Sequence, residues 1–160
     1  MQSSRTIIAL IMVIVLMTSV ITMFGLMHLF KDPNDQYRVD HDYEVSGTYS
    51  SYSVTGNGHS QYINENSSYV YRVTTTYSFF DGEKQTTAET PVFTVICDSN
   101  KKVDESLYTY MGTKDADGST YNLWKYTKDS LSVIFTIDSN LCIHEYILTD
   151  DALSLNATLK

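Results

Sequence analysis

An apolar run from Ile7 to Phe30 is the first pattern along the chain, and Arg5 and Lys31 bound it. The run contains no charged residue and no Pro, and Gly25 is its one glycine. A helix of this length spans about 36 Å, which is enough to cross a hydrocarbon core of about 30 Å. The pattern predicts a transmembrane helix over residues 6–30.

A cleaved secretory signal is the alternative interpretation of this run. Such a signal has a shorter apolar core and a small-residue cleavage site. Here the weak candidates for a cleavage site are followed by more apolar residues. We therefore expect an uncleaved signal anchor. Because Arg5 is the only charged side chain in residues 1–5, the positive-inside rule places that segment in the cytoplasm. The predicted localisation is the cell membrane, single-pass, with the C-terminal domain outside the cytoplasm.

Residues 31–42 are polar and contain Pro33, which is typical of a linker. From residue 43 the pattern alternates with period two, most clearly from Ser68 to Phe80, and this predicts β-strands. The segment Thr55-Gly56-Asn57-Gly58 is expected to be a tight turn that ends the first strand. Asp81-Gly82 is expected to form a hairpin turn, and Pro91 marks a bulge, a strand start or an edge in the returning segment 83–97.

Shorter strands separated by turn residues are expected in the rest of the chain, at 106–113, 119–127, 130–137, 141–148 and 153–159. The prediction is an all-β domain over residues 43–160, an antiparallel meander of about 7–8 strands. One face of the sheet is apolar, so the sheet should cover it as a curved half-barrel, a barrel or a sandwich.

Charge narrows the range of partners. All 19 acidic residues follow residue 31, against nine Lys or Arg there, so the outer part carries a net charge of −10. Nucleic acid and anionic lipid surfaces both require a basic footprint, and we expect the domain to dock on neither.

Cys97 and Cys142 both fall within predicted strands. An oxidising compartment makes a disulfide between them plausible, and closing that loop would contribute about 4 kcal/mol in the chain-entropy model. Two free buried thiols are the alternative. Asn66 and Asn156 begin N-x-S/T triplets and are possible glycosylation sites.

Catalytic and metal-binding patterns are weak. The run Asp115-Ala-Asp-Gly118 resembles the start of a calcium loop, but Tyr126 occupies the position where the loop needs Glu. His41, His59 and His144 belong to no recognisable motif. We expect no catalytic, cofactor-binding or metal-binding residue and no enzymatic activity. A hydrolase would need His144 or His59 within hydrogen-bond reach of Ser, Cys or a carboxylate in a cleft.

All 13 tyrosines lie outside the apolar run. Tyrosines at period two usually pack within a sheet, yet exposed aromatic side chains also make good contact surfaces. The candidates for a ligand or partner surface are Tyr49, Tyr52, Tyr69, Tyr71, Tyr77 and Trp124.

The run GTKDADGSTYNLWKYTKDSLSVIFTIDSNLCIHEYIL, residues 112–148, is similar to the closing meander of lipoprotein-carrier-like half-barrels. The overall layout also resembles small signal-anchored extracytoplasmic β proteins of methanogenic archaea, which implies a surface location and no known activity.

The leading hypothesis is a single-pass membrane protein with no enzymatic role, whose outer domain binds a protein partner or has an envelope structural role. The alternative is a carrier or sensor of an apolar ligand, which needs a pocket of several hundred Å³, lined by Tyr, Phe and Leu.

Overall fold

The computed structural model describes residues 37–160. The predicted cytoplasmic segment 1–5 and the predicted anchor 6–30 lie outside the described residues, as does the first half of the predicted linker. Within residues 37–160, no helix has the length and apolar character needed to span a bilayer.

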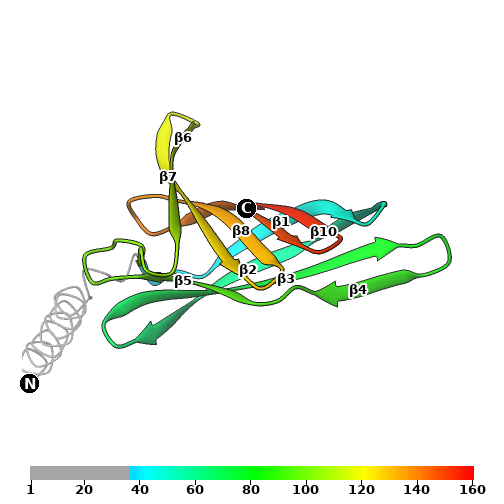
Figure 1. The fold of residues 1–160 in the computed structure, drawn as a ribbon, viewed down its shortest axis with the longest axis horizontal. Helices are drawn as coiled ribbons and strands as arrows, with labels where there is room; N and C mark the ends of the chain where they lie inside the picture. The colour runs from blue at the N-terminus through cyan, green and yellow to red at the C-terminus, as the bar shows by residue number, and fades with distance from the viewer. Residues whose placement is uncertain (1–36) are drawn as a thin grey trace, which may run out of the picture. The chain divides into compact units, whose positions relative to one another are not determined.

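Ten strands form one antiparallel sheet in the order β4-β3-β2-β1-β10-β9-β8-β7-β6, and β5 pairs with β3 (Figure 1). The strands are β1 (His41–Tyr49), β2 (Tyr52–Glu65), β3 (Ser68–Phe80), β4 (Gln85–Glu89), β5 (Phe93–Cys97), β6 (Thr109–Ala116), β7 (Ser119–Lys128), β8 (Leu131–Ile137), β9 (Ile143–Asp150) and β10 (Leu153–Leu159). The all-β antiparallel meander is confirmed, but it has ten strands rather than the expected 7–8. The sheet is not closed by backbone pairing, so the closed barrel among the three expected shapes is wrong.

The predicted turn at residues 55–58 is also wrong. The chain reverses instead at Ser50 and Ser51, and β2 runs straight through Gly56 and Gly58. These glycines allow other groups to come close, because a Cβ on Gly56 would lie 2.1 Å from the carbonyl oxygen of Thr76. Close backbone approach is the second common reason for glycine in a strand, and it leaves the same sequence signature as a turn.

The long strand β3 pairs with two short strands along the same edge. Its first half, Tyr69–Val73, pairs with β5, and its second half, Thr76–Phe80, pairs with β4. The break between β4 and β5 falls at Pro91, which has no backbone N–H to donate. Of the three expectations at Pro91, a bulge, a strand start or an edge, the structure shows the edge, because the break lies between two short strands that pair with the same side of β3.

Aromatic side chains fill the interior of the coiled sheet and join its two ends. Phe93 of β5 contacts Tyr146 of β9 and Tyr126 of β7, with ring centroids 5.5 Å and 6.5 Å apart. Tyr43 of β1 packs edge-on against Tyr146, with centroids 5.2 Å apart. Side chains therefore connect strands that no backbone hydrogen bond joins.

The buried tyrosine hydroxyls have hydrogen-bond partners, as polar groups in an interior require. The Tyr43 hydroxyl donates to the carbonyl oxygen of Ile143 at 2.9 Å, and the Tyr146 hydroxyl lies 2.7 Å from Oγ1 of Thr75. Tyrosine and phenylalanine rings therefore fill this part of the interior, which a carrier would keep open for an apolar ligand.

The edge strands discourage further pairing. In β6 the register shifts between Tyr110 and Gly112, and Gly112 has φ +114°. A bulge twists the edge strand, and the exposed Lys114 adds a charge to it. On the other edge β4 has only five residues. Sheet-to-sheet association through these edges is therefore opposed on both sides.

Candidate functional site

The six aromatic residues predicted as a contact surface lie in three separate places. Tyr49, Tyr52 and Tyr77 come together, and Phe79 joins them. Tyr69 and Tyr71 are in the core near the other end of β3. Trp124 lies on β7.

We define the aromatic end cluster as Tyr49, Tyr52, Tyr77 and Phe79. The ring of Phe79 lies 4.9 Å from that of Tyr49, 5.9 Å from that of Tyr52 and 6.4 Å from that of Tyr77. Tyr49 and Tyr52 are 36% and 37% exposed, whereas Tyr77 is buried beneath them. The cluster is thus a supported aromatic surface that water reaches.

Strand register explains why these four rings meet. Tyr49 and Tyr52 are paired across the β1–β2 turn, and Phe79 pairs with Val54 two residues further along β2. Side chains two apart on a strand share a face, so all four rings lie on the inner face of the sheet. Phe79 was not among the predicted residues, although its place two residues after Tyr77 on the same strand is the signal that finds it.

The cluster contains no formally charged side chain. Burial, with smaller effects from Tyr49 and Asp150, raises the pKa of Tyr77, so its hydroxyl stays neutral. Phe80, which follows Phe79 on β3, points to the opposite face of the sheet and is 59% exposed.

Tyr69 and Tyr71 belong to the core. They are only 6% and 2% exposed, and the Tyr71 hydroxyl donates to the backbone carbonyl of Tyr37. The Tyr37 ring in turn packs edge-on against Tyr69, 5.9 Å away. These two tyrosines have the packing role that the sequence offers as the alternative to a contact surface.

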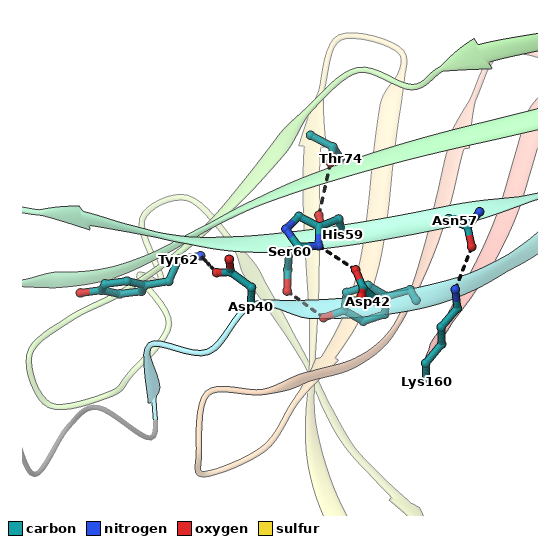
Figure 2. A network of polar contacts seen from close by, with 9 residues as sticks. Asp40, Asp42, Asn57, His59, Ser60, Tyr62, Thr74 and Lys160 are labelled. Carbon is teal, nitrogen blue, oxygen red and sulfur yellow. Dashed lines mark hydrogen bonds and ion pairs between the residues drawn. The ribbon is translucent and has the colours of Figure 1, made fainter.

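His59 lies in a network of polar contacts on the first strands (Figure 2). Its Nδ1 is 2.8 Å from Oδ1 of Asp42, and both side chains are well exposed. The neighbouring Ser60 faces the interior, where its hydroxyl lies 3.2 Å from that of Tyr43. His59 thus has a carboxylate partner, but the adjacent serine is on the other face of the sheet.

His144 meets the requirement stated for the hydrolase hypothesis, because it lies beside a hollow and has a carboxylate within hydrogen-bond reach. Its Nε2 is 3.3 Å from Oδ2 of Asp138, and it lines a hollow of about 210 Å³ together with Lys114 and Glu145, which form an ion pair. The Asp138 carboxylate also accepts the backbone N–H of Cys142, so it stabilises the turn before β9. This histidine–carboxylate pair is part of the local fold.

The nearby thiol is not activated as a nucleophile. Burial, together with the charge of Asp138, raises the pKa of Cys142 to about 11, so the thiol stays protonated near neutral pH. Among residues 37–160, no group of three or more His, Cys, Asp or Glu side chains is arranged to hold a metal ion.

The predicted disulfide between Cys97 and Cys142 is not formed, and both residues are free cysteines. Cys97 faces the interior from β5 and is fully buried, whereas Cys142 precedes β9 and is partly exposed. The two predicted strands do exist near these residues, but they do not place the two sulfurs at bonding distance.

The two glycosylation triplets differ in their surroundings. Asn66 is exposed in the β2–β3 turn with φ +44°, and Asn156 is an exposed position within β10. A turn presents an acceptor side chain more freely than a paired strand does.

Comparisons of the chain with models of protein families, with curated proteins and with solved structures gave no match.

Proposed function

We propose that this chain is a single-pass membrane protein whose β domain lies outside the cytoplasm and binds a protein partner without catalysing a reaction. The observation that carries the proposal is the aromatic end cluster, which exposes Tyr49 and Tyr52 above the buried Tyr77.

The chemistry of the cluster fits a protein partner. Tyrosine and phenylalanine rings bury much area and lose few rotamers on binding, which is why aromatic residues are enriched at the centres of interfaces. The rings of the cluster pack against one another, so their side chains lose little conformational entropy when a partner binds.

The net charge supports the choice of partner. Residues 37–160 contain 17 Asp or Glu and nine Lys or Arg, a net charge of −8. An acidic domain repels nucleic acid and anionic lipid headgroups, whereas an uncharged aromatic surface on it can still dock a protein.

Membrane anchoring rests on the apolar run within residues 6–30. In membranes of cells that express the chain, alkaline carbonate should leave it in the pellet, and protease added outside spheroplasts should digest residues 43–160. Release by carbonate, or a domain protected until the membrane is permeabilised, would contradict the proposal.

Partner binding is tested with a photo-crosslinking amino acid in the full-length chain in intact cells. Placed at Tyr52, it should give one discrete protein adduct. The matched control is Phe80, which is more exposed than Tyr52 but lies on the opposite face, and it should give none.

Adding Tyr49→Ala to the Tyr52 crosslinker should remove the adduct, because Tyr49 supports the same surface. Equal adducts from positions 52 and 80, or an adduct that Tyr49→Ala leaves unchanged, would argue that the crosslinks report exposure alone.

A further inference from the structure

A second surface feature lies on β6 and β7, away from the aromatic end cluster. A hollow of about 350 Å³ is bounded by these two strands, by the β8–β9 turn and by the connection 98–108. Its size suits a small ligand. None of the four residues of the aromatic end cluster lines it.

The walls of the hollow are apolar and aromatic. Val103, Ile137 and Leu141 are all at most 6% exposed, and they form its inner surface with Trp124. Tyr110 pairs with Trp124 across β6 and β7, with ring centroids 5.0 Å apart, and Tyr110 is 51% exposed. Tyr110 therefore presents an exposed aromatic ring to a ligand in the hollow.

Trp124 contributes a donor with no partner. Its side chain is 7% exposed, and its enclosed Nε1 has no hydrogen-bond acceptor within the part of the chain that the structure describes. A buried N–H without an acceptor is costly, and the cost disappears if a bound molecule supplies the acceptor.

The rim offers donors and acceptors in balance. Lys101 and Lys102 stand with the carboxylates of Glu105 and Asp138, and the exposed Asn122 adds an amide. The formal charges cancel, which disfavours a strongly anionic or cationic ligand. A hydroxyl both donates and accepts, so a polyhydroxylated neutral molecule suits a rim that presents both kinds of group.

Local hydrogen bonds hold the rim in place. Oδ1 of Asp98 accepts the backbone N–H of Lys102 at 2.9 Å, and the Lys101 ammonium lies 3.6 Å from the centroid of the Tyr37 ring. Oδ1 of Asp138 accepts the backbone N–H of Asn140 at 2.8 Å. Groups fixed before binding lose little entropy when a ligand arrives.

We infer that this hollow binds a neutral saccharide. The C–H face of a pyranose ring packs on Tyr110, its hydroxyls bond Asn122 and the charged rim, and one of its oxygens accepts the Trp124 N–H once a side-chain shift opens that N–H to the hollow. A simple apolar ligand would leave the indole N–H without an acceptor, and the rim, whose two lysines balance its two carboxylates, offers a phosphorylated ligand no net positive charge.

Trp124 is the single tryptophan of the chain, so its fluorescence reports this site alone. We would titrate the full-length chain in nanodiscs with the methyl glycosides of glucose, galactose, mannose and N-acetylglucosamine. At least one should give a saturable change with a Kd of roughly millimolar, the range expected for one sugar ring in an open site.

Variants assign the signal to the hollow. Tyr110→Ala and Asn122→Ala alter exposed side chains and should each weaken binding about tenfold, whereas Phe80→Ala should not change it. Trp124→Phe keeps an aromatic ring and loses the N–H, and calorimetry should show about fivefold weaker binding. If Trp124→Phe does not fold, the two surface variants decide.

The proposal is overturned if no glycoside gives a saturable change, or if Tyr110→Ala and Asn122→Ala bind as tightly as the parent chain. Saturation by N-acetyltyrosine amide without saturation by any glycoside would assign the hollow to peptide side chains instead. Because the hollow and the aromatic end cluster share no residue, failure here leaves the partner-binding proposal standing.

Discussion

The hydroxyl of Tyr146 occupies the space beside Gly58 in which any other residue would carry its Cβ. A Cβ on Gly58 would lie 2.1 Å from that hydroxyl oxygen, and 3.2 Å from the Cβ of Tyr43. The same hydroxyl bonds Thr75 of β3, so a side chain of β9 reaches across the interior to a strand that is not its neighbour. The absence of a side chain at position 58 allows this link.

We expect Gly58→Ala to lower the free energy of unfolding by about 2–4 kcal/mol. The added methyl group overpacks the interior and displaces the Tyr146 hydroxyl from Thr75. This destabilisation outweighs the small stabilisation that alanine gives by lowering the conformational entropy of the unfolded chain. Urea unfolding followed by circular dichroism measures the change. Thr55→Ala, at an exposed position of the same strand, is the control and should stay within about 0.5 kcal/mol. A Gly58→Ala variant as stable as the parent would show that β9 does not pack as described.

Gly58 also shows which features of the fold the sequence predicts and which it does not. Alternation located β3 and β10 to the residue, because side chains of a half-buried strand must alternate. The Gly56-Asn57-Gly58 signal fits a turn equally well, since the groups that approach these glycines, Thr76 and Tyr146, are far away in sequence. Local patterns locate strands, but they do not show which strands pack across the interior.

Stability should fall steeply under alkaline conditions. Burial raises the pKa of Tyr108, Tyr146 and Cys97 to about 12, and it raises the pKa of Tyr43 and Tyr71 further. In the unfolded chain tyrosine titrates near pH 10 and cysteine near pH 9, so above those values the unfolded state binds fewer protons than the folded state. Stability is therefore complete below about pH 9 and is lost as the pH rises toward 12, by about 1.4 kcal/mol per pH unit for each such group.

Urea midpoints measured between about pH 8 and pH 11 test this expectation. Tyr146→Phe removes one of the groups and should make the decline shallower, at the cost of the hydrogen bond to Thr75. A midpoint that stays constant over the whole range would mean that these hydroxyls are not buried.

Both cysteines should behave as unreactive thiols. Reducing agent should leave the thermal midpoint of the purified chain unchanged, because no bridge is broken. Iodoacetamide near pH 8 should modify the partly exposed Cys142 slowly and the buried Cys97 only after unfolding, since the thiolate is the reactive form and burial raises the pKa of both thiols. Intact mass spectrometry reads both results, and a native mass two hydrogens below the reduced mass would restore the disulfide.

Two hairpin turns form a matched pair for testing backbone strain. Asn66 and Ser67 have φ of +44° and +67°, and Asp117 and Gly118 have φ of +52° and +77°. Each pair joins two strands with both central residues at positive φ, a geometry in which glycine is preferred at the second position. Ser67→Gly should stabilise the fold by about 0.5–1 kcal/mol, and Gly118→Ser should destabilise it by a similar amount. Urea midpoints that move in the same direction for both variants would contradict the turn geometry.

The candidate surfaces were predictable only in part. Tyr49, Tyr52 and Tyr77 were recognisable as aromatic residues in strands, but their meeting depends on the β1–β2 and β2–β3 registers, which in turn depend on where the chain reverses. The misplaced turn at residues 55–58 removed that information. Trp124 was singled out by its residue type, whereas its partner Tyr110 lies in a strand that starts three residues later than expected, because Tyr108 anchors the preceding connection in the core.

The pairing of β1 with β10 joins the strands that come first and last in chain order among the ten, from Tyr43 opposite Leu159 to Tyr49 opposite Leu153. During synthesis β1, β2 and β3 emerge first and can form their hairpins at once, yet one edge of β1 has no partner until the final strand is made. Contacts this distant in sequence form slowly, and an unpaired edge invites association with other chains. The nascent domain therefore passes through a stage in which one edge of β1 is unpaired. Synthesis of Leu153–Leu159 ends that stage.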